Sequence, residues 1–520
     1  MERQAGILLH VSSLPGPFGI GTMGQEARKF IDRLSEAGIG WWQVLPLTQP
    51  AEDNPRDNSP YKCYSTFAGN TWLCDPREIE NDLGLLEEYE LRDYMSFDDG
   101  YLTDYAFVHS NSQRYLGQAF SRLDEDGMRE VQEFLETEDW LLDYALFRCA
   151  REELEGLPWW EWPEDLKRRD PATLARFRQE HEQQINFIAF CQWVFRRQWL
   201  ALREYANERG VRIFGDLPFY VSDDSSDVWT NPELFALNEN LEPEEVAGVP
   251  PDYFSEDGQR WGNTLYDWDA MRKDGYRWWI RRIEHAHGIY DRLRIDHFRA
   301  LASYWAIPAT SETAREGSWR PGPGMELLEA VHAALGDVDI VAEDLGGLSE
   351  DVHELLADSG YPGMEVLQFS LSPGDYGTSR PHRWTANSCA YTGTHDNDTL
   401  FGWLWHTDEE ERRFALEYVG FPPEADWRKG GPESPVCRAF VRMLWASVAN
   451  FVCVPIQDLL GFGSDTRMNV PGQPEDCWRF RVTHHALESV DFQWLAELGR
   501  IYDRHAGIQA ARSVEMAEAL

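Results

Sequence analysis

Short apolar segments recur along this chain, and most of them are separated by stretches with helical periodicity. Segments of this length, bounded by turn residues, predict strands rather than helices. A helix between successive strands indicates that the strands pair in parallel, because a parallel connection needs a crossover. The predicted strands are Ala5–His10, Trp41–Leu47, Arg212–Leu217, the part of Tyr290–Ala300 that ends at Asp296, Val338–Ala342, Met364–Phe369, Ser388–Thr392 and Phe451–Ile456.

This order of strands and helices predicts an α/β fold, a (β/α)8 TIM barrel with inserted, mainly helical subdomains. We expect residues 1–520 to form a single catalytic barrel, with a helical insertion at 75–183 and a lid or loop insertion at 218–268. A formal G-x-G-x-x-G at Gly19–Gly24 suggests a dinucleotide fold instead. However, it does not follow the first strand directly, and the second strand ends without an acid. We therefore expect these glycines to shape a loop that faces substrate.

Charge and cysteine usage limit the partners and the compartment. The 520 residues include 48 Lys and Arg against 90 Asp and Glu, a formal net charge of −42, which disfavours nucleic acid and anionic membranes as partners. No apolar run approaches the ~20 residues of a membrane span, and the N-terminus lacks a leader pattern. The eight cysteines form no C-x-x-C motif, which predicts buried free thiols and a cytoplasmic protein. Because lysine is scarce, we also hypothesise adaptation to high salt.

Carboxylates follow three of the predicted strands, at the rim where barrels of this kind carry their active sites: Asp296, Glu343 and Asp396. Arg294 shares a strand face with Asp296 and is expected to keep it ionised, whereas Glu343 follows an apolar run and is expected to hold a proton. One carboxylate and one carboxylic acid suit glycosidic bond cleavage, with retention if they stand ~5 Å apart. The alternative is a divalent-metal site, which the nearby arginines and histidines disfavour.

Several longer motifs resemble those of one known family. They are Gly6–Pro15 (GILLHVSSLP), Trp42–Leu47 (WQVLPL), Ser59–Tyr61 with Phe67–Asn70, Gly215–Pro218 (GDLP), Pro250–Phe254 (PPDYF), Arg294–Phe298 (RIDHF), Ala342–Gly346 (AEDLG), Thr392–Asn397 (TGTHDN) and Arg467–Gly472 (RMNVPG). With them, nearly the whole chain resembles the 4-alpha-glucanotransferases of the amylomaltase, or disproportionating-enzyme, type (glycoside hydrolase family 77, alpha-amylase clan).

The resemblance implies an activity and its partners. The expected enzyme (EC 2.4.1.25) transfers a segment of a 1,4-alpha-D-glucan to the 4-hydroxyl of an acceptor glucose or glucan, in glycogen and maltodextrin metabolism. Its substrates would be maltooligosaccharides and glucans derived from starch or glycogen. The implied mechanism is a retaining double displacement with a covalent glycosyl-enzyme, and it needs neither a cofactor nor a metal.

Roles for single residues also follow from the resemblance. Asp296 is the expected nucleophile, Glu343 the general acid and then base, and Asp396 the acid that holds the sugar's 2- and 3-hydroxyls. Asn469 and Pro471 also match, and we expect them to be structural. The expected substrate-binding residues are Tyr61, Asp216, Arg294 and His395 at the cleavage point, and Tyr253 and Phe254 in a lid over the acceptor side.

Some alternatives remain open at this point. His395 could be a rim histidine that only satisfies its own hydrogen bonds. An alpha-glucan hydrolase of the same clan would use the same acids, and its products would differ. A non-catalytic glucan-binding protein would lack the three acids, and a nucleotide-dependent transferase would need a phosphate loop that this sequence lacks.

Overall fold

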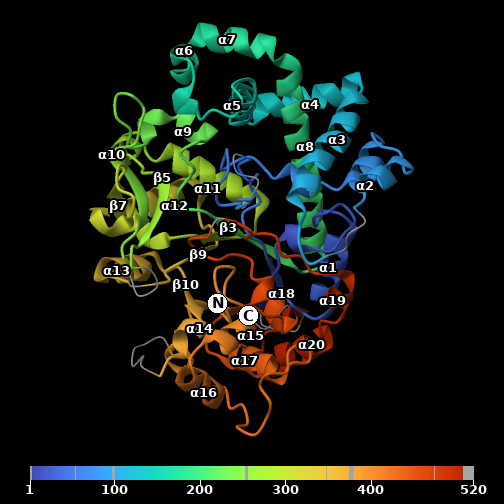
Figure 1. Cartoon of the computed structure of the whole chain (residues 1–520), viewed down its shortest axis with the longest axis vertical. Helices are drawn as coiled ribbons and strands as arrows, with labels where there is room; N and C mark the ends of the chain where they lie inside the picture. Colours follow the sequence, from blue (N-terminus) through green and yellow to red (C-terminus); the bar gives the residue numbers. More distant parts are fainter. Residues whose placement is uncertain are drawn as a thin grey trace, which may run out of the picture.

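A parallel sheet of eight strands forms the centre of the computed structural model (Figure 1). The structure describes residues 3–52, 54, 56–96, 100–251, 256–346, 348–373, 380–473 and 475–507. The strands of this sheet are β1 (Gln4–Leu8), β2 (Trp41–Gln43), β3 (Arg212–Leu217), β6 (Arg292–Ile295), β9 (Ile340–Ala342), β10 (Gly363–Val366), β11 (Ser388–Tyr391) and β12 (Phe451–Pro455).

The sheet runs in the order β10-β11-β12-β1-β2-β3-β6-β9, so chain order is also spatial order. β1 pairs in parallel with both β12 and β2, with Gly6 opposite Cys453 on one side and Trp41 on the other. Between β9 and β10, the amide of Ala342 donates to the carbonyl of Pro362 at 2.9 Å, which brings the two ends of the sheet together. The predicted barrel of eight strands in chain order is confirmed.

Several strands end one or two residues earlier than the sequence predicted, and two end earlier still. The second strand was expected to reach Leu47 but ends at Gln43, shortly before Pro46, which has no amide to donate to a ladder. The sixth was expected to reach Phe369, but β10 ends at Val366 and the chain turns at once into the short helix α14 (Leu367–Ser370). Both differences concern strand ends, where apolar composition persists after the ladder has stopped.

Helices surround the barrel on its outside (Figure 1). Besides α14, the helices outside the long β2–β3 connection are α1 (Gln25–Glu36), α9 (Ser226–Thr230), α10 (Trp268–Lys273), α11 (Arg277–Ile289), α12 (Met325–Leu335), α13 (Glu350–Ser359), α15 (Leu400–His406), α16 (Glu409–Tyr418), α17 (Pro435–Ala446), α18 (Ile456–Leu459), α19 (His484–Glu488) and α20 (Phe492–Ile501). Among the described residues, no helix is long and apolar enough to cross a membrane. All eight cysteines are buried and free, as predicted.

The long connection between β2 and β3 is helical and forms the upper part of Figure 1. Glutamines on its longest helix, α8, attach it to the loop after β2: the side chain of Gln192 both donates to and accepts from the backbone of Gly69, and Gln198 does the same with Asp75. The helices of this connection are α2 (Pro76–Glu78), α3 (Tyr105–Ser121), α4 (Glu125–Thr137), α5 (Leu141–Glu153), α6 (Glu164–Lys167), α7 (Pro171–Glu180) and α8 (Glu182–Glu208).

The first loop packs against this helical connection. A Cβ at Gly24 would clash with the carboxylate of Asp75, and one at Gly19 would clash with the ring of Phe107 in α3. The hydroxyl of Thr22 donates to Asp75 at 2.6 Å. The glycines of the G-x-G-x-x-G pattern therefore serve close packing, which differs from the substrate-facing role that we expected.

A second, antiparallel sheet stands beside the barrel, and sequence reasoning did not predict it. Its strands β4 and β5 fall within 218–268, which we had interpreted as a lid or loop. Strands β7 and β8 come from the segment after β6, so the two halves of this sheet are separated by α10, α11 and β6. The order is β5 (Gln259–Thr264), β4 (Glu245–Val249), β7 (Ser303–Pro308) and β8 (Ser318–Pro321).

Candidate active site

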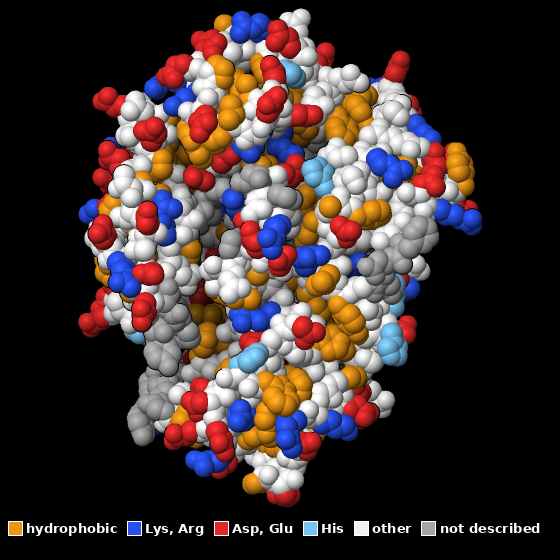
Figure 2. All heavy atoms as spheres, in the orientation of Figure 1, with side chains coloured by type: hydrophobic (Ala, Val, Ile, Leu, Met, Phe, Trp, Pro, Cys, Tyr) orange, Lys and Arg blue, Asp and Glu red, His pale blue; other side chains and the backbone are white. Residues whose placement is uncertain are grey.

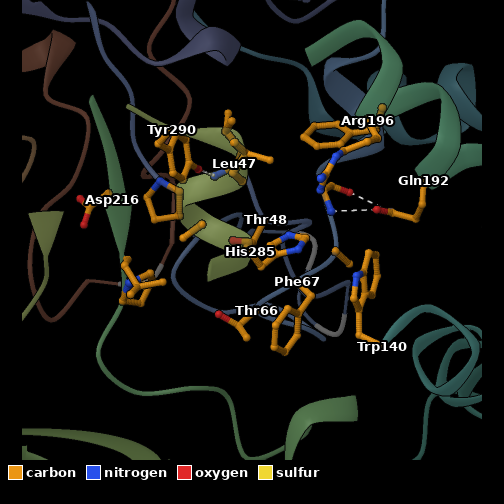
Figure 3. Close-up of a pocket in the computed structure, with 18 of the residues that line it drawn as sticks. Leu47, Thr48, Thr66, Phe67, Trp140, Gln192, Arg196, Asp216, His285 and Tyr290 are labelled. Atoms are coloured by element: carbon orange, nitrogen blue, oxygen red, sulfur yellow. Dashed lines mark hydrogen bonds between the residues drawn. The ribbon is translucent and has the colours of Figure 1, made fainter. Parts of the chain in front are cut away.

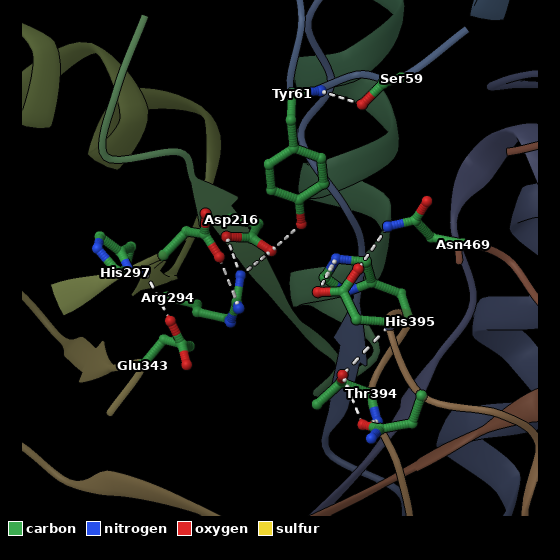
Figure 4. Close-up of polar contacts among 12 residues, drawn as sticks. Ser59, Tyr61, Asp216, Arg294, His297, Glu343, Thr394, His395 and Asn469 are labelled. Atoms are coloured by element: carbon green, nitrogen blue, oxygen red, sulfur yellow. Dashed lines mark hydrogen bonds and ion pairs between the residues drawn. The ribbon is translucent and has the colours of Figure 1, made fainter. Parts of the chain in front are cut away.

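The carboxyl ends of the barrel strands bring the predicted polar residues together (Figure 4). Asp216 lies in β3, Asp296 directly follows β6, and Glu343 directly follows β9. The amide of Asp296 still donates to the carbonyl of Leu217 at 3.0 Å, and the amide of Glu343 donates to the carbonyl of Ile295 at 3.0 Å. These bonds extend the ladder beyond the strands and set the position of each acidic residue relative to its neighbour.

Arg294 connects two of these carboxylates. Its Nη1 donates to both oxygens of Asp216 at 2.8 and 2.7 Å, and its Nη2 lies 2.8 Å from Oδ1 of Asp296. The side chains of Arg294 and Asp216 are 4% and 0% exposed, whereas that of Asp296 is 28% exposed. Burial opposes the charge of Arg294, but the two carboxylates raise its pKa well above the usual range. The guanidinium therefore stays charged and turns toward Asp296, the carboxylate that solvent can reach.

Backbone amides hold Glu343. Its Oε2 accepts from the amide of His297 at 2.7 Å, and its Oε1 accepts from the amide of Leu345 at 2.9 Å. His297 has a φ of 51°, in the left-handed region that non-glycine residues rarely adopt. Such backbone conformations cluster at functional sites, and this one lies at the amide that donates to Glu343.

Burial determines the proton affinity of the acid pair. It raises the pKa of Glu343 to about 7, against the opposing effect of Arg294. It also raises the pKa of Asp296 to about 6, and here too Arg294 acts in the opposite direction. Glu343 has the higher pKa of the two, which agrees with the expectation that Glu343 holds the proton. Arg294 lowers the pKa of Asp296, which is the direction that we expected, although the loss of solvation has the larger effect.

Asp396 approaches from the other side of the site, on the loop after β11. Its Oδ2 lies 3.2 Å from Nε2 of His395, and its Oδ1 accepts from Nδ2 of Asn469 at 2.6 Å. Arg467 donates to the backbone carbonyl of Asp396 at 2.9 Å. Asn469 therefore contacts a predicted site carboxylate directly. Its sequence signal was the RMNVPG motif, from which we inferred only a structural role.

Aromatic rings form a wall next to these acids. The hydroxyl of Tyr61 donates to Oδ2 of Asp216 at 2.7 Å, and its ring stacks on His395 with centroids 5.3 Å apart and planes 14° apart. Trp478 packs beside both rings, with centroids 5.5 Å from Tyr61 and 5.7 Å from His395. His395 is thus stacked at the rim and directed at Asp396. No motif in the sequence pointed to Trp478, which reaches this wall from a distant loop.

We predicted that Tyr253 and Phe254 cover the acceptor side of the site. Both residues lie outside the described residues. Trp261, in β5 of the second sheet, is 40% exposed and packs edge-on against His297 with centroids 4.8 Å apart. His297 donates to Glu343, so Trp261 stands near the acid. Its contact with the site depends on the second sheet and could not be predicted from its neighbours in sequence.

The structure also has a cavity that the three predicted catalytic carboxylates do not line. It lies between the barrel and the helical connection and is lined by residues such as Leu47, Gln192, Arg196 and His285 (Figure 3). Asp216 also lines it, whereas Asp296, Glu343 and Asp396 do not. Within the described part of the chain, no group of three His, Cys, Asp or Glu side chains is placed to hold a metal ion.

Comparisons with known proteins show which family the chain belongs to. A family model described as 4-alpha-glucanotransferase matches residues 9–487. The 4-alpha-glucanotransferase of Streptococcus pneumoniae serotype 4 is 40% identical over 507 residues, 97% of this chain and 98% of that protein, and that of Thermus thermophilus is 41% identical over 494 residues, 93% and 95%. The solved amylomaltase from Streptococcus agalactiae in complex with acarbose matches with a TM-score of 0.91 at 37% identity, covering 97% of this chain and 100% of that one. The chain belongs to the 4-alpha-glucanotransferase family.

Proposed function

We propose that the strand-end acids Asp296 and Glu343, together with Asp396, form the active site of this 4-alpha-glucanotransferase. Asp296 attacks the anomeric carbon of the donor sugar while Glu343 protonates the departing glycosidic oxygen, which leaves a covalent glycosyl-enzyme. Glu343 then takes the proton from the 4-hydroxyl of the acceptor, which attacks the same carbon and releases Asp296. Two displacements at one carbon retain its configuration.

One observation carries this assignment: the two acids have different environments. Asp296 is paired with a guanidinium and partly open to solvent, which suits a nucleophile that must be ionised. Glu343 has the higher pKa, about 7, which suits a general acid near neutral pH. A pair of titratable groups whose environments separate their pKa values is the usual sign of an acid and nucleophile assignment.

The remaining site residues are proposed to bind the donor sugar. Tyr61 and His395 offer a flat stacked surface, and Asp396, oriented by Asn469, presents a carboxylate to sugar hydroxyls. The S. agalactiae amylomaltase is described in complex with acarbose. We infer that this chain binds maltooligosaccharides and starch- or glycogen-derived glucans, with glucose as a small acceptor.

The acceptor side is proposed to exclude water. Transfer requires an acceptor sugar bound and oriented well enough to compete with bulk water for the glycosyl-enzyme. Trp261 provides one aromatic surface near Glu343, and the predicted lid residues Tyr253 and Phe254 would add to it. We further propose that segments 75–183 and 218–268 act as subdomains that shape the site, and that the enzyme works in the cytoplasm, without nucleic-acid partners.

The primary test is the exchange Glu343→Gln, assayed with maltotriose. We expect turnover to fall by on the order of 10³-fold or more while the fold is retained, because the amide cannot donate or accept the proton. Glu365→Gln is the matched control: this half-buried carboxyl lies on the next strand, and burial raises its pKa to about 8. Parent-like turnover of Glu343→Gln would refute the assignment.

The product profile separates transfer from hydrolysis. Transfer from maltotriose yields glucose together with oligosaccharides longer than the substrate, whereas hydrolysis yields glucose and maltose alone. Added glucose should redirect the products toward shorter chains if it serves as the acceptor. A profile of glucose and maltose only, unchanged by added acceptor, would instead identify an alpha-glucan hydrolase.

A further inference from the structure

One exposed tryptophan, Trp405, and two partly buried aromatic side chains beside it, Phe401 and Trp427, form a group on the outside of the barrel. Trp405, at the end of α15, is 50% exposed. Its ring lies 4.9 Å from that of Trp427 at an angle of 57°, and Phe401 packs edge-on against it with centroids 6.3 Å apart. These three residues are the aromatic patch. Figure 2 shows hydrophobic side chains beside charged ones on the lower part of the molecule, where Figure 1 places α15 and α16.

Arg412 supports one ring of the patch, that of Trp427. Arg412 lies over the ring of Trp427 at 5.0 Å, and its Nη1 also donates to the carbonyls of Leu404 and Thr407 at 3.2 and 3.0 Å. Arg412 thus joins α16 to the end of α15 and supports Trp427 on one face. A supported ring loses little conformational freedom when a ligand binds to it, which favours binding. Single exposed apolar residues are ordinary on protein surfaces, but here an exposed tryptophan lies against two partly buried rings, one of which is supported by an arginine, and such a group is a feature of interaction sites.

Polar groups border the patch. Asp426 and Arg428 flank Trp427 in sequence, form an ion pair of 2.9 Å, and are both more than half exposed. His406, next to Trp405, is exposed, and its Nδ1 lies 3.0 Å from Asp398. A flat apolar surface bordered by donors and acceptors matches a sugar ring, which has apolar faces and a hydroxyl edge. A partner with a strongly charged surface would have little to pair with here, because the border carries both signs.

The patch is separate from the acids. α15 begins four residues after Asp396, and Trp405 lies five residues further, ~8 Å along the helix at ~1.5 Å per residue. Leu400 and Leu404 are buried beneath the helix, whereas Trp405 points to solvent. A polymeric glucan engaged at the rim is long enough to touch both places, and two linked contacts raise the effective affinity without a change at either site.

We propose that the aromatic patch is a second binding site for an alpha-1,4-glucan chain, with Trp405 as its stacking platform. This inference rests on the proposed function, since it takes the same polymer as its ligand. The site binds without catalysing, and it increases the affinity of the enzyme for long glucans. It contributes nothing to the turnover of short ones such as maltotriose.

The test is native electrophoresis in gels that contain amylopectin, with Glu343→Gln as the background so that the polymer is not consumed. We expect Trp405→Ala to weaken retardation by about tenfold in apparent dissociation constant, as the loss of one aromatic anchor does. Trp405→Tyr keeps a ring and should retain most of the binding. Trp319→Ala is the matched control, because Trp319 is 44% exposed but the guanidinium of Arg299 lies over its ring at 4.3 Å.

The single variant Trp405→Ala, with Glu343 intact, separates the two proposals. Its turnover of maltotriose should equal that of the parent, while its KM for amylopectin rises. Retardation that is unchanged in Trp405→Ala, or equally lost in Trp319→Ala, would overturn the second site. The second site would also be overturned if Trp405→Ala changed the sedimentation of the protein from dimer to monomer but left its retardation unchanged. The patch would then be a surface for self-association. If Trp405→Ala does not fold, Trp405→Tyr and Trp427→Ala supply the same comparison.

Discussion

The two sides of the active site are built differently. On the strand side, Arg294 is held by Asp216 of the neighbouring strand β3. Glu343 is held by the amides of His297 and Leu345, which follow β6 and β9. On the loop side, Asp396 is held by Asn469, which lies 73 residues further along the chain. One side therefore inherits the rigidity of the barrel, whereas the other depends on a long-range contact between loops.

The two sides also differ in how far their side chains are exposed to solvent. The side chains of Arg294 and Asp216 are almost fully buried, and that of Asp396 is 39% exposed. A buried ion pair makes a large difference to stability when it is broken, whereas an exposed contact adjusts with little cost. We expect substitutions on the strand side to change both chemistry and stability, and those on the loop side to change mainly how the sugar is positioned.

The largest effect should come from the nucleophile. Asp296→Asn is expected to lower kcat on maltotriose by on the order of 10⁴-fold, because the amide cannot form the glycosyl-enzyme. The melting temperature should rise, because burial raises the pKa of Asp296 and the substitution removes a charge that the folded state disfavours. Residual turnover within tenfold of the parent would show that the strand side does not carry the covalent step.

The next effect concerns the buried arginine. Arg294→Lys keeps the charge but cannot bridge Asp216 and Asp296 with a planar fork, so kcat should fall by about 10²-fold and stability by about 2 kcal/mol. Arg292→Lys is the control, since Arg292 is equally buried on β6 but pairs with Asp339 at 2.9 Å, away from the site. The control should lose stability and keep kcat. Equal loss of kcat in both variants would mean that Arg294 acts only through folding.

A smaller effect is expected on the loop side. Asn469→Ala removes the donor to Asp396 and should lower kcat/KM for maltotriose by about tenfold, with a melting temperature close to that of the parent. Asn387→Ala is a suitable control, because Asn387 donates to the carbonyl of Gly360 at 3.0 Å in an exposed region. If Asn469→Ala unfolds the protein, the loop side is as integral to the fold as the strand side.

The pH dependence should report the strand side alone. Asp296 must be ionised, so activity falls as pH decreases through about 6, and Glu343 must be protonated, so activity falls as pH rises through about 7. The two values belong to the pair as a unit, because the acids interact. A profile of kcat/KM against pH should be bell-shaped, and Asn469→Ala should leave both limbs in place. A flat profile between pH 5 and about 9 would contradict the acid pair.

Much of this architecture could be predicted from local patterns. Strand periodicity and the helices between strands predicted all eight strands of the barrel in their order, and the acids at strand ends predicted where Asp296 and Glu343 would lie. The second sheet was missed, because β4 pairs with β7, a strand that follows β6 in the chain. Trp261 and Trp478 were missed for a related reason, since each reaches the site only through contacts between distant segments.

The sequence by itself determined the barrel, the three carboxylates at its rim and the family to which the chain belongs, because strand pattern and motif are local properties of the chain. Only the tertiary structure decided the partners of those carboxylates. Arg294 has to serve both Asp216 and Asp296, and Asn469 has to arrive from another loop to meet Asp396. It also decided the proton affinities of the acid pair, because desolvation depends on everything packed around a group and cannot be read from its neighbours in the chain.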